Sequence, residues 1–297
     1  MPASQHVHAA HYFDLATALH LASAAELIYA DPGVVERTAV AAWKYPYFRF
    51  FDVETTQCLV AADSRAIVVC FRGTEGNRVE DWIANIGFDL IAGPLGGRVH
   101  KGFYDALSCV WHLLDKEVTR LQNAGRRELW VTGHSLGAAL ATLAVARWCE
   151  AGRQVSGLYT FGQPRTGDNT FARNFDFTFR PHAFRIVNDL DVVTRVPPRV
   201  LGYQHLGTFI YFDDSGTLSD DILCWRRFLS GWHGAVEKVL VWGREGIDDH
   251  RMMHYRQQIA GALQRQGSGR GVCEPAAAVL RRETTVAQRV RPRRRAA

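Results

Sequence analysis

The chain has 297 residues, of which 47% are hydrophobic and 22% are charged. This composition is ordinary for a folded globular protein and excludes general disorder. The length allows one large α/β domain or two small ones. The net charge of +5 is unevenly spread, because nine arginines and two glutamates lie between residues 265 and 297. A basic tail of this kind does not indicate specific nucleic-acid binding.

The six cysteines are widely separated, since no two lie closer than twelve residues. This spacing excludes a C-x-x-C redox pair and a zinc finger, and it favours buried free thiols in a reducing compartment over disulfides. The first basic residue is Arg37, so we expect no secretory leader. No segment approaches the roughly 18 apolar residues that a membrane span needs. These features together predict a cytoplasmic protein.

Periodicity and turn residues predict the regular elements of the chain. In chain order, we expect a helix over 12–30, strands over 57–61 and 66–71, a helix over 101–124, a strand over 128–132, a helix over 136–150, and strands over 155–161 and 183–187. Strands and helices alternate through the middle of the chain. This alternation predicts an α/β fold whose mostly parallel sheet is flanked by helices on both faces.

The last third of the chain changes character. A helical apolar stripe with several tryptophans runs through residues 219–246, and glycines after Ala260 predict a linker. The residues beyond have no apolar periodicity. We therefore predict one domain over residues 1–262 and a basic, disordered tail over residues 263–297.

The most informative segment is Gly133-His-Ser-Leu-Gly137, a G-x-S-x-G motif between a predicted strand and a predicted helix. Such a turn is so sharp that the residues two before and two after the serine nearly touch, so both must be glycine. The motif predicts that Ser135 is a nucleophile at a helix N-terminus, where negative charge is favoured. The alternative is an ordinary turn in which Ser135 caps the helix.

A serine nucleophile needs a histidine base and a carboxylate that orients it. Both types follow downstream in the order that such elbow motifs require. The acid is Asp189 or Asp191 after a predicted strand, and the base is His250 or His254. Chain order alone does not choose within either pair.

Four separated blocks together resemble the class 3 lipase family, which contains the fungal triacylglycerol lipases. The blocks are Phe71–Thr74 with Asp81–Phe88, Val99–Phe103, Gly133–Gly137 with Thr160–Gly167, and Asp191–Pro198 with His250. They cover roughly residues 55 to 260. The resemblance implies an α/β-hydrolase fold and the hydrolysis of lipid esters.

The resemblance also implies roles for individual residues. The aspartate that opens the D-x-V-x-R-x-P-P block is the family's acid, here Asp191, and the histidine of the D-H-x-x-x-x-Y-like block is its base, here His250. The oxyanion donors correspond to Thr74 and to the N–H of Leu136, the residue after the nucleophile. No cofactor is implied, and we expect no metal, because His250 and His254 have no evident third ligand.

In this family the segment after Thr74 is a lid over the nucleophile. Its apolar residues Val79, Trp82, Ile83 and Ile86 recur at helical spacing. We expect Trp82, Ile83 and Ile86 to contact substrate or a lipid surface when the lid opens. The alternative is a fixed helix packed on the core.

The sequence therefore predicts a serine ester hydrolase that cleaves acylglycerol-like lipids through an acyl-enzyme. Its expected partners are the lipid ester and, peripherally, a lipid surface. A phospholipase A or a feruloyl-type esterase would use the same triad. The alternative from another class of protein is a catalytically inactive lipid-binding module, which the complete Ser, Asp, His and Thr set argues against.

Overall fold

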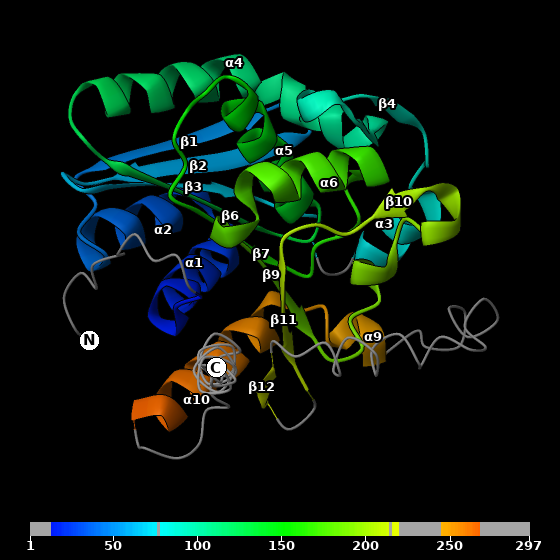
Figure 1. The fold of residues 1–297 in the computed structure, drawn as a ribbon. Coiled ribbons are helices and arrows are strands. Elements are labelled where there is room, and N and C mark those ends of the chain that lie inside the picture. Colours follow the sequence, from blue (N-terminus) through cyan, green and yellow to red (C-terminus); the bar gives the residue numbers. More distant parts are fainter. Residues whose placement is uncertain (1–12, 76–77, 214–215, 220–244, 268–297) are drawn as a thin grey trace, which may run out of the picture.

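The computed structural model describes residues 13–75, 78–213, 216–219 and 245–267, and an eight-stranded sheet forms its centre (Figure 1). In their spatial order, the strands are β1 (Tyr47–Val53), β2 (Thr56–Ala62), β3 (Ala66–Phe71), β6 (Glu128–His134), β7 (Gly157–Phe161), β9 (Ala183–Asn188), β11 (Thr208–Phe212) and β12 (Leu218–Ser219). The strands from β3 to β11 are parallel, and the outer pairings are antiparallel.

Helices cover both faces of this sheet, as predicted. The helices that connect parallel strands lie on one face, and helices from the two ends of the described chain lie on the other. The helices that connect parallel strands are α4 (Lys101–Asn123), α5 (Leu136–Glu150) and α6 (Asn169–Phe179), and all three pack on one face. Strands are added in one direction across the sheet, so right-handed crossovers place every connecting helix on the same side. The opposite face is covered by α1 (Leu15–Leu27) and α10 (Met252–Gly267), which pack against each other (Figure 1).

The α/β-hydrolase fold class is confirmed, as are the predicted helices and strands, with small shifts at their ends. The first helix begins one residue after Asp14, whose carboxylate accepts the N–H of Thr17 at 2.7 Å. Strand β6 runs two residues beyond the predicted end, to His134. The strand therefore leads directly into the G-x-S-x-G turn.

Several short elements were not predicted, because they contain too few residues to show a period. They include a second, antiparallel sheet of β4 (Leu90–Ala92), β5 (Arg98–His100), β8 (Gly167–Asp168) and β10 (Tyr203–Gln204). They also include α2 (Pro32–Arg37), α9 (Glu245–Asp248) and the helical turns η1 (Thr38–Ala42), η3 (Pro94–Gly96), η4 (Arg180–His182), η5 (Val193–Arg195) and η6 (Arg199–Leu201). The longer elements β1, α6 and β11 were missed as well.

The prediction of a linker after Ala260 is wrong, because α10 continues through Gly261 and ends only at Gly267. Its buried side chains Ile259 and Ala262 pack on the sheet, and this burial outweighs the weak helix preference of glycine. The helix therefore crosses the predicted domain boundary at residue 262. Most of the tryptophan-rich stripe and nearly all of the predicted tail lie outside the described residues.

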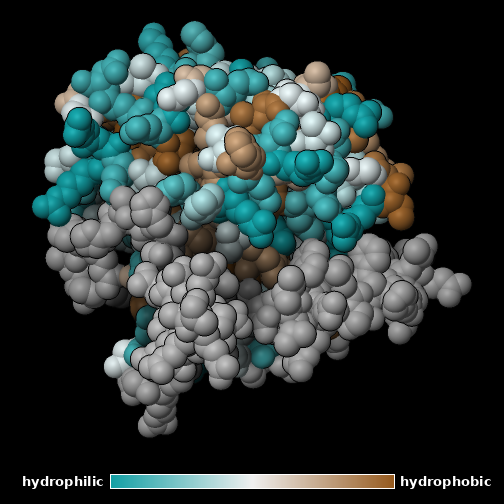
Figure 2. Space-filling model, viewed as in Figure 1, coloured by the Kyte–Doolittle hydropathy of each residue, from teal (hydrophilic) through white to brown (hydrophobic). Residues whose placement is uncertain are grey.

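The outer surface of the helix layer is mainly hydrophilic. In the view of Figure 2, polar residues predominate over this layer, and the apolar patches between them are small and separate. Helix α4 shows the reason, because its apolar residues recur at helical spacing and are buried against the sheet. Within the residues that the structure describes, none of the helices combines the length and apolarity that a membrane crossing requires.

Candidate active site

The G-x-S-x-G segment forms a strained turn between β6 and α5. Ser135 has φ 59° and ψ −128°, a conformation that costs energy for a residue with a side chain. A Cβ on Gly133 would lie 2.3 Å from the carbonyl oxygen of Gly137, and a Cβ on Gly137 would lie 2.2 Å from that of Phe71. Only glycine fits at both positions, so the turn has the geometry of a nucleophile elbow.

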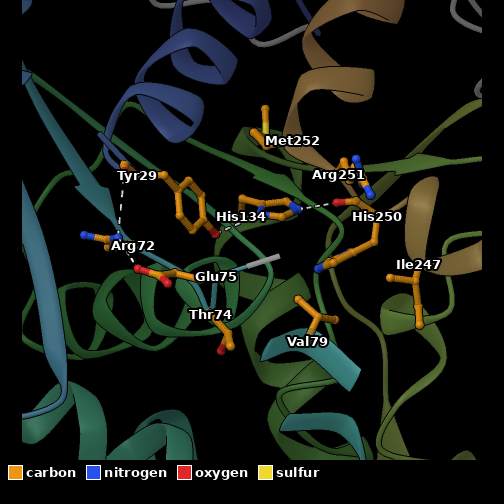
Figure 3. Close-up of a pocket in the computed structure, with 10 residues that line it drawn as sticks. All are labelled: Tyr29, Arg72, Thr74, Glu75, Val79, His134, Ile247, His250, Arg251 and Met252. Atoms are coloured by element: carbon orange, nitrogen blue, oxygen red, sulfur yellow. Dashed lines mark hydrogen bonds and ion pairs between the residues drawn. The ribbon is translucent and has the colours of Figure 1, made fainter. Parts of the chain in front are cut away.

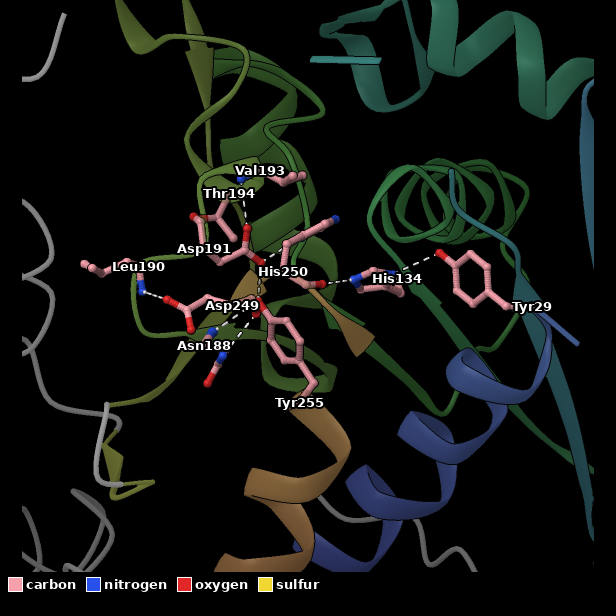
Figure 4. A network of polar contacts seen from close by, with 10 residues as sticks. All are labelled: Tyr29, His134, Asn188, Leu190, Asp191, Val193, Thr194, Asp249, His250 and Tyr255. Carbon is pink, nitrogen blue, oxygen red and sulfur yellow. Dashed lines mark hydrogen bonds and ion pairs between the residues drawn. The ribbon is translucent and has the colours of Figure 1, made fainter. Parts of the chain in front are cut away.

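The structure brings Asp191 and His250 together, although 59 residues separate them. His250 Nδ1 lies 2.9 Å from Asp191 Oδ2, and both side chains are buried. The same carboxylate oxygen accepts the hydroxyl of Tyr255 at 2.5 Å, and Asp191 Oδ1 accepts the N–H of Val193 at 2.8 Å (Figure 4). Both oxygens of Asp191 are thus oriented by neighbours on two different elements.

The other two candidates lie elsewhere. Asp189 Oδ1 accepts the hydroxyl of Tyr211 at 3.0 Å. His254 lies in the first turn of α10, one helical turn beyond His250. The two-residue spacing of the aspartates does not put both carboxylates on one face, because Asp189 adopts φ 30° where β9 has ended.

Burial and charge act in opposite directions on Asp191. Burial by itself would raise the pKa of its carboxyl group. The charge of His250, its hydrogen bond and the hydrogen bond from Tyr255 together outweigh burial and lower that pKa. Burial and the adjacent Asp191 charge raise the pKa of the Tyr255 hydroxyl. Asp191 is therefore held ionised, and Tyr255 remains a neutral donor.

Two buried atoms of the site have no hydrogen-bond partner among the described residues: Ser135 Oγ and His250 Nε2. Since His250 Nδ1 donates to an ionised carboxylate, the neutral ring carries its free lone pair on Nε2. One atom is a hydroxyl donor and the other a nitrogen acceptor, so they are chemically complementary. Hydrogen bonds of this type are often long or absent without substrate.

A pocket of about 290 Å³ is lined in part by His250 and by His134, the residue before Ser135 (Figure 3). Its lining comprises Tyr29, Arg72, Thr74, Glu75, Val79, His134, Ile247, His250, Arg251 and Met252. The apolar members come from α3 (Val79–Asn85), α9 and α10. Three members are charged: Arg72 and Glu75 form an ion pair of 2.8 Å, and Arg251 pairs with Asp248 at 2.9 Å. The pocket thus joins apolar walls to a polar rim, as a site for an amphipathic ligand would.

The predicted oxyanion donors lie on either side of the elbow. Thr74 lines the pocket and follows Gly73, where an added Cβ would lie 3.2 Å from Ser135 Cβ. Leu136 is the first residue of α5, so its N–H belongs to the first turn, where N–H groups have no partner within the helix. Both groups are thus in the segments that flank Ser135.

The segment predicted to be a lid forms α3. The ring of Trp82 stacks on Phe103 with the centroids 6.3 Å apart, and Ile86 packs against the same core cluster. Ile83 packs beside Val192 and Val193. All three predicted lid residues are therefore half-buried against the body of the domain. This packing is compatible with a closed lid and with a fixed helix.

Sequence reasoning assigned no role to Tyr255, His134 and Tyr29. Tyr255 stands in the D-H-x-x-x-x-Y-like block, so its fixed spacing from His250 was an available signal. His134 is part of the elbow motif itself. No signal pointed to Tyr29, whose hydroxyl reaches His134 across 105 residues of sequence. Among the described residues, no group of three or more His, Cys, Asp or Glu side chains gathers as metal ligands would.

The chain is similar in sequence to known lipases. A model of the family described as Lipase (class 3) matches residues 68–201. A lipase of Rhizomucor miehei is 33% identical over 170 residues, which cover 54% of this chain and 46% of that protein. A secreted mono- and diacylglycerol lipase of Malassezia globosa is 31% identical over 212 residues, which cover 67% of each chain.

The fold is also similar to those of solved lipase structures. A triacylglycerol lipase whose catalytic centre is described as a serine protease triad has a TM-score of 0.58 and 26% identity, over 67% of this chain and 80% of that chain. Lipase II from Rhizopus niveus has a TM-score of 0.56 and 26% identity, over 67% of this chain and 81% of that chain. The chain spans about half the length of the first curated relatives that it matches.

Proposed function

Because the chain belongs to the class 3 lipase family, we propose that it is a serine ester hydrolase acting on acylglycerol-like lipids. In this proposal Ser135 is the nucleophile, His250 the general base and Asp191 the acid that orients it. The observation that carries the proposal is the buried Asp191–His250 pair, which leaves His250 Nε2 without a partner, like Ser135 Oγ.

The reaction follows from the available protons. His250 Nε2 takes the proton of Ser135 Oγ as this oxygen bonds to the ester carbonyl carbon. The resulting oxyanion is stabilised by the N–H groups of Leu136 and Thr74, and the Thr74 hydroxyl adds a third donor. As the tetrahedral intermediate collapses, His250 gives its proton to the leaving alcohol, and an acyl-enzyme remains. Water, deprotonated by His250, then releases the fatty acid and restores Ser135.

The electrostatics of the pair favour these steps. Imidazolium forms transiently in each half-reaction, and the ionised Asp191 beside it stabilises that charge. The Tyr255 hydroxyl donates its hydrogen bond to Asp191, so it does not compete with Ser135 for the lone pair of His250 Nε2. Among the described residues Ser135 Oγ has no hydrogen-bond partner, so no such bond to this hydroxyl has to be broken before attack.

An ester panel tests the proposal. The folded protein should hydrolyse a soluble short-chain ester, and a serine-directed phosphonate should label Ser135 and stop turnover. Absence of both activities would leave the lipid-binding module as the function. A chain-length series on emulsified acylglycerols, run beside phosphatidylcholine and a feruloyl ester, then separates a lipase from a phospholipase A and a feruloyl-type esterase.

We also propose peripheral contact with lipid surfaces, which rests on the arginine-rich segment 265–297. Near an anionic surface each arginine contributes about 1 kcal/mol, and salt screens this attraction. A chain ending at Gly267, where α10 ends, should keep soluble-ester turnover and lose binding to anionic vesicles. The boundary between domain and tail and the cytoplasmic location remain predictions, and two of the relatives are described as secreted.

A further inference from the structure

We propose that His134 and Tyr29 are positioning residues, which hold the backbone of His250 and thereby place its imidazole for the Ser135 hydroxyl. The proposal rests on the proposed function, since it assigns these residues a part in the same reaction. Neither side chain is given a role by the triad or by the oxyanion donors.

His134 is held in one tautomer by its two neighbours. Its Nε2 lies 2.6 Å from the carbonyl oxygen of His250, and a carbonyl only accepts, so Nε2 carries the proton. Its Nδ1 lies 2.9 Å from the hydroxyl of Tyr29. Burial, reinforced by the charge of His250, lowers the pKa of His134 to about 3. His134 is therefore neutral, and its bare Nδ1 accepts the Tyr29 hydroxyl proton.

The neutral state has a consequence for His250. The two imidazole rings lie with centroids 4.4 Å apart and planes at 30°. A positive charge on His134 would oppose the imidazolium that forms on His250 during turnover. By holding Nδ1 in its acceptor state, the Tyr29 hydroxyl favours the tautomer that can donate to His250 and keeps the neighbouring ring uncharged.

Tyr29 also connects the two halves of the site. It follows α1, on the face of the sheet opposite the crossover helices, and reaches the end of β6 (Figure 4). Its hydroxyl lies against the backbone of Gly73, where an added Cβ would lie 2.5 Å from the hydroxyl oxygen. Gly73 precedes Thr74, so one hydroxyl contacts both the oxyanion segment and His134.

His250 needs this support because it lies in a turn between α9 and α10, outside both helices. Asp191 holds its ring at Nδ1, and His134 holds its main-chain oxygen. With both ends fixed, rotation of the imidazole away from Ser135 is restricted. Loss of the main-chain contact should misplace the base without removing any reacting group.

The test compares Tyr29→Phe, His134→Phe, His134→Gln and the double variant Tyr29→Phe/His134→Phe on a soluble ester. His134→Phe keeps a ring but loses both hydrogen bonds, and kcat should fall about 100-fold with KM nearly unchanged. His134→Gln can still donate an amide N–H to His250 and should recover a large part of the loss. Tyr29→Phe should lower kcat about 10-fold. In the double variant the part of this loss that passes through His134 is already included in the loss of His134→Phe, so the combined loss should be smaller than the product of the two single losses.

The matched control is Tyr45→Phe, which removes the hydroxyl of another tyrosine–histidine pair, Tyr45 and His20, 2.8 Å apart and outside the site. It should leave kcat unchanged. Additive losses in the double variant, no recovery with glutamine, or an equal loss in Tyr45→Phe would overturn the proposal.

A measurement without substrate separates this proposal from the proposed function. In protein labelled with ¹⁵N-histidine, the NMR shifts of His134 should report a neutral ring protonated at Nε2 at pH 5, and Tyr29→Phe should introduce the Nδ1-protonated tautomer. A charged or Nδ1-protonated His134 in the unaltered protein contradicts the positioning role. If the protein hydrolyses no ester, the proposed function fails, whereas the tautomer still decides whether His134 holds His250.

Discussion

The two halves of the candidate site differ in how they are held. On the acid–base side, Asp191 accepts three hydrogen bonds, and His250 is held through its ring and its main chain. On the nucleophile side, Ser135 has a strained backbone, and its hydroxyl has no partner among the described residues. The hydrogen-bonding groups on the acid–base side are thus nearly all paired, whereas the serine hydroxyl can still form hydrogen bonds.

The difference indicates where the site is rigid and where it can respond. Among the described residues, His250 Nε2 and Ser135 Oγ both lack a hydrogen-bond partner, and these are the two atoms that exchange a proton in the proposed reaction. Unsatisfied buried polar groups cost stability, and they persist where function requires them. If this difference is functional, changes at Ser135 should remove the chemical step, and changes around Asp191 and the main chain of His250 should misplace the imidazole.

The largest effect is expected at the nucleophile. Ser135→Ala should lower kcat by a factor on the order of 10⁶, because no other group can form the acyl-enzyme. The variant should melt at or above the temperature of the unaltered protein, since it removes an unsatisfied hydroxyl. Steady-state kinetics and calorimetry measure the two quantities. Phosphonate labelling at another serine in the unaltered protein would contradict the assignment.

The base should be nearly as important. His250→Ala should lower kcat by a factor on the order of 10⁵ to 10⁶, whereas the matched change His254→Ala should keep most of the activity. His254 lies four residues further along, inside α10, whereas His250 precedes that helix and bonds to Asp191. Turnover of both variants on a soluble ester decides the assignment, provided that both melt like the unaltered protein. A reversed ranking would exchange the roles.

The acid orients rather than reacts, so its loss should cost less. Asp191→Asn should lower kcat by a factor on the order of 10⁴, because the amide favours the wrong tautomer of His250. The control Asp189→Asn changes a carboxylate that Tyr211 contacts outside the pair, and most activity should remain. Comparable losses in the two variants would mean that charge near the site matters more than the specific hydrogen bond.

A smaller and substrate-dependent effect is expected at α3. If α3 is a lid, Trp82→Ala and Ile86→Ala should reduce turnover of emulsified long-chain esters about 10-fold and leave soluble short-chain esters nearly unaffected. Phe103 stacks on Trp82 and supplies the fixed side of the contact, so Phe103→Leu is the packing control. Equal losses on both substrates would identify α3 as a fixed helix.

The smallest effect concerns stability rather than rate. The pKa of His134 is about 3 in the folded protein and ordinarily 6.5. Between these values the unfolded chain binds more protons, so the free energy of unfolding should fall as the pH is lowered from 6.5. His134→Gln removes this contribution. Denaturant unfolding between pH 4 and 7 should therefore give a slope that is shallower than that of the unaltered protein by up to about 1.4 kcal/mol per pH unit. Parallel slopes would show that His134 is not buried as a neutral ring.

The sequence by itself determined the local features of this protein. The glycines at 133 and 137 stand at positions where a side chain would clash, so they indicate the sharp turn. The apolar period of α4 and the long apolar run of α5 indicate helices. The alternation of strands and helices specified the α/β class. Most of these features follow from residues close in sequence, so the pattern of residue types is sufficient to predict them. The close approach of Gly137 to Phe71 is an exception that depends on the fold.

Residue types and chain order left two aspartates and two histidines open. The resemblance to the lipase blocks favoured Asp191 and His250, and the tertiary structure shows these two side chains in contact. Asp191 and His250 lie 59 residues apart, and Asp189, in the turn that separates the two aspartates, accepts a hydrogen bond from Tyr211 of the neighbouring strand. The reach of Tyr29 to His134 likewise requires α1 to pack on the face that the crossover helices leave open. Such contacts arise from chain direction and packing, which residue patterns do not encode locally. The sequence therefore showed which residue types form the site. The contacts between them, such as that of Tyr29 with His134, depend on the fold.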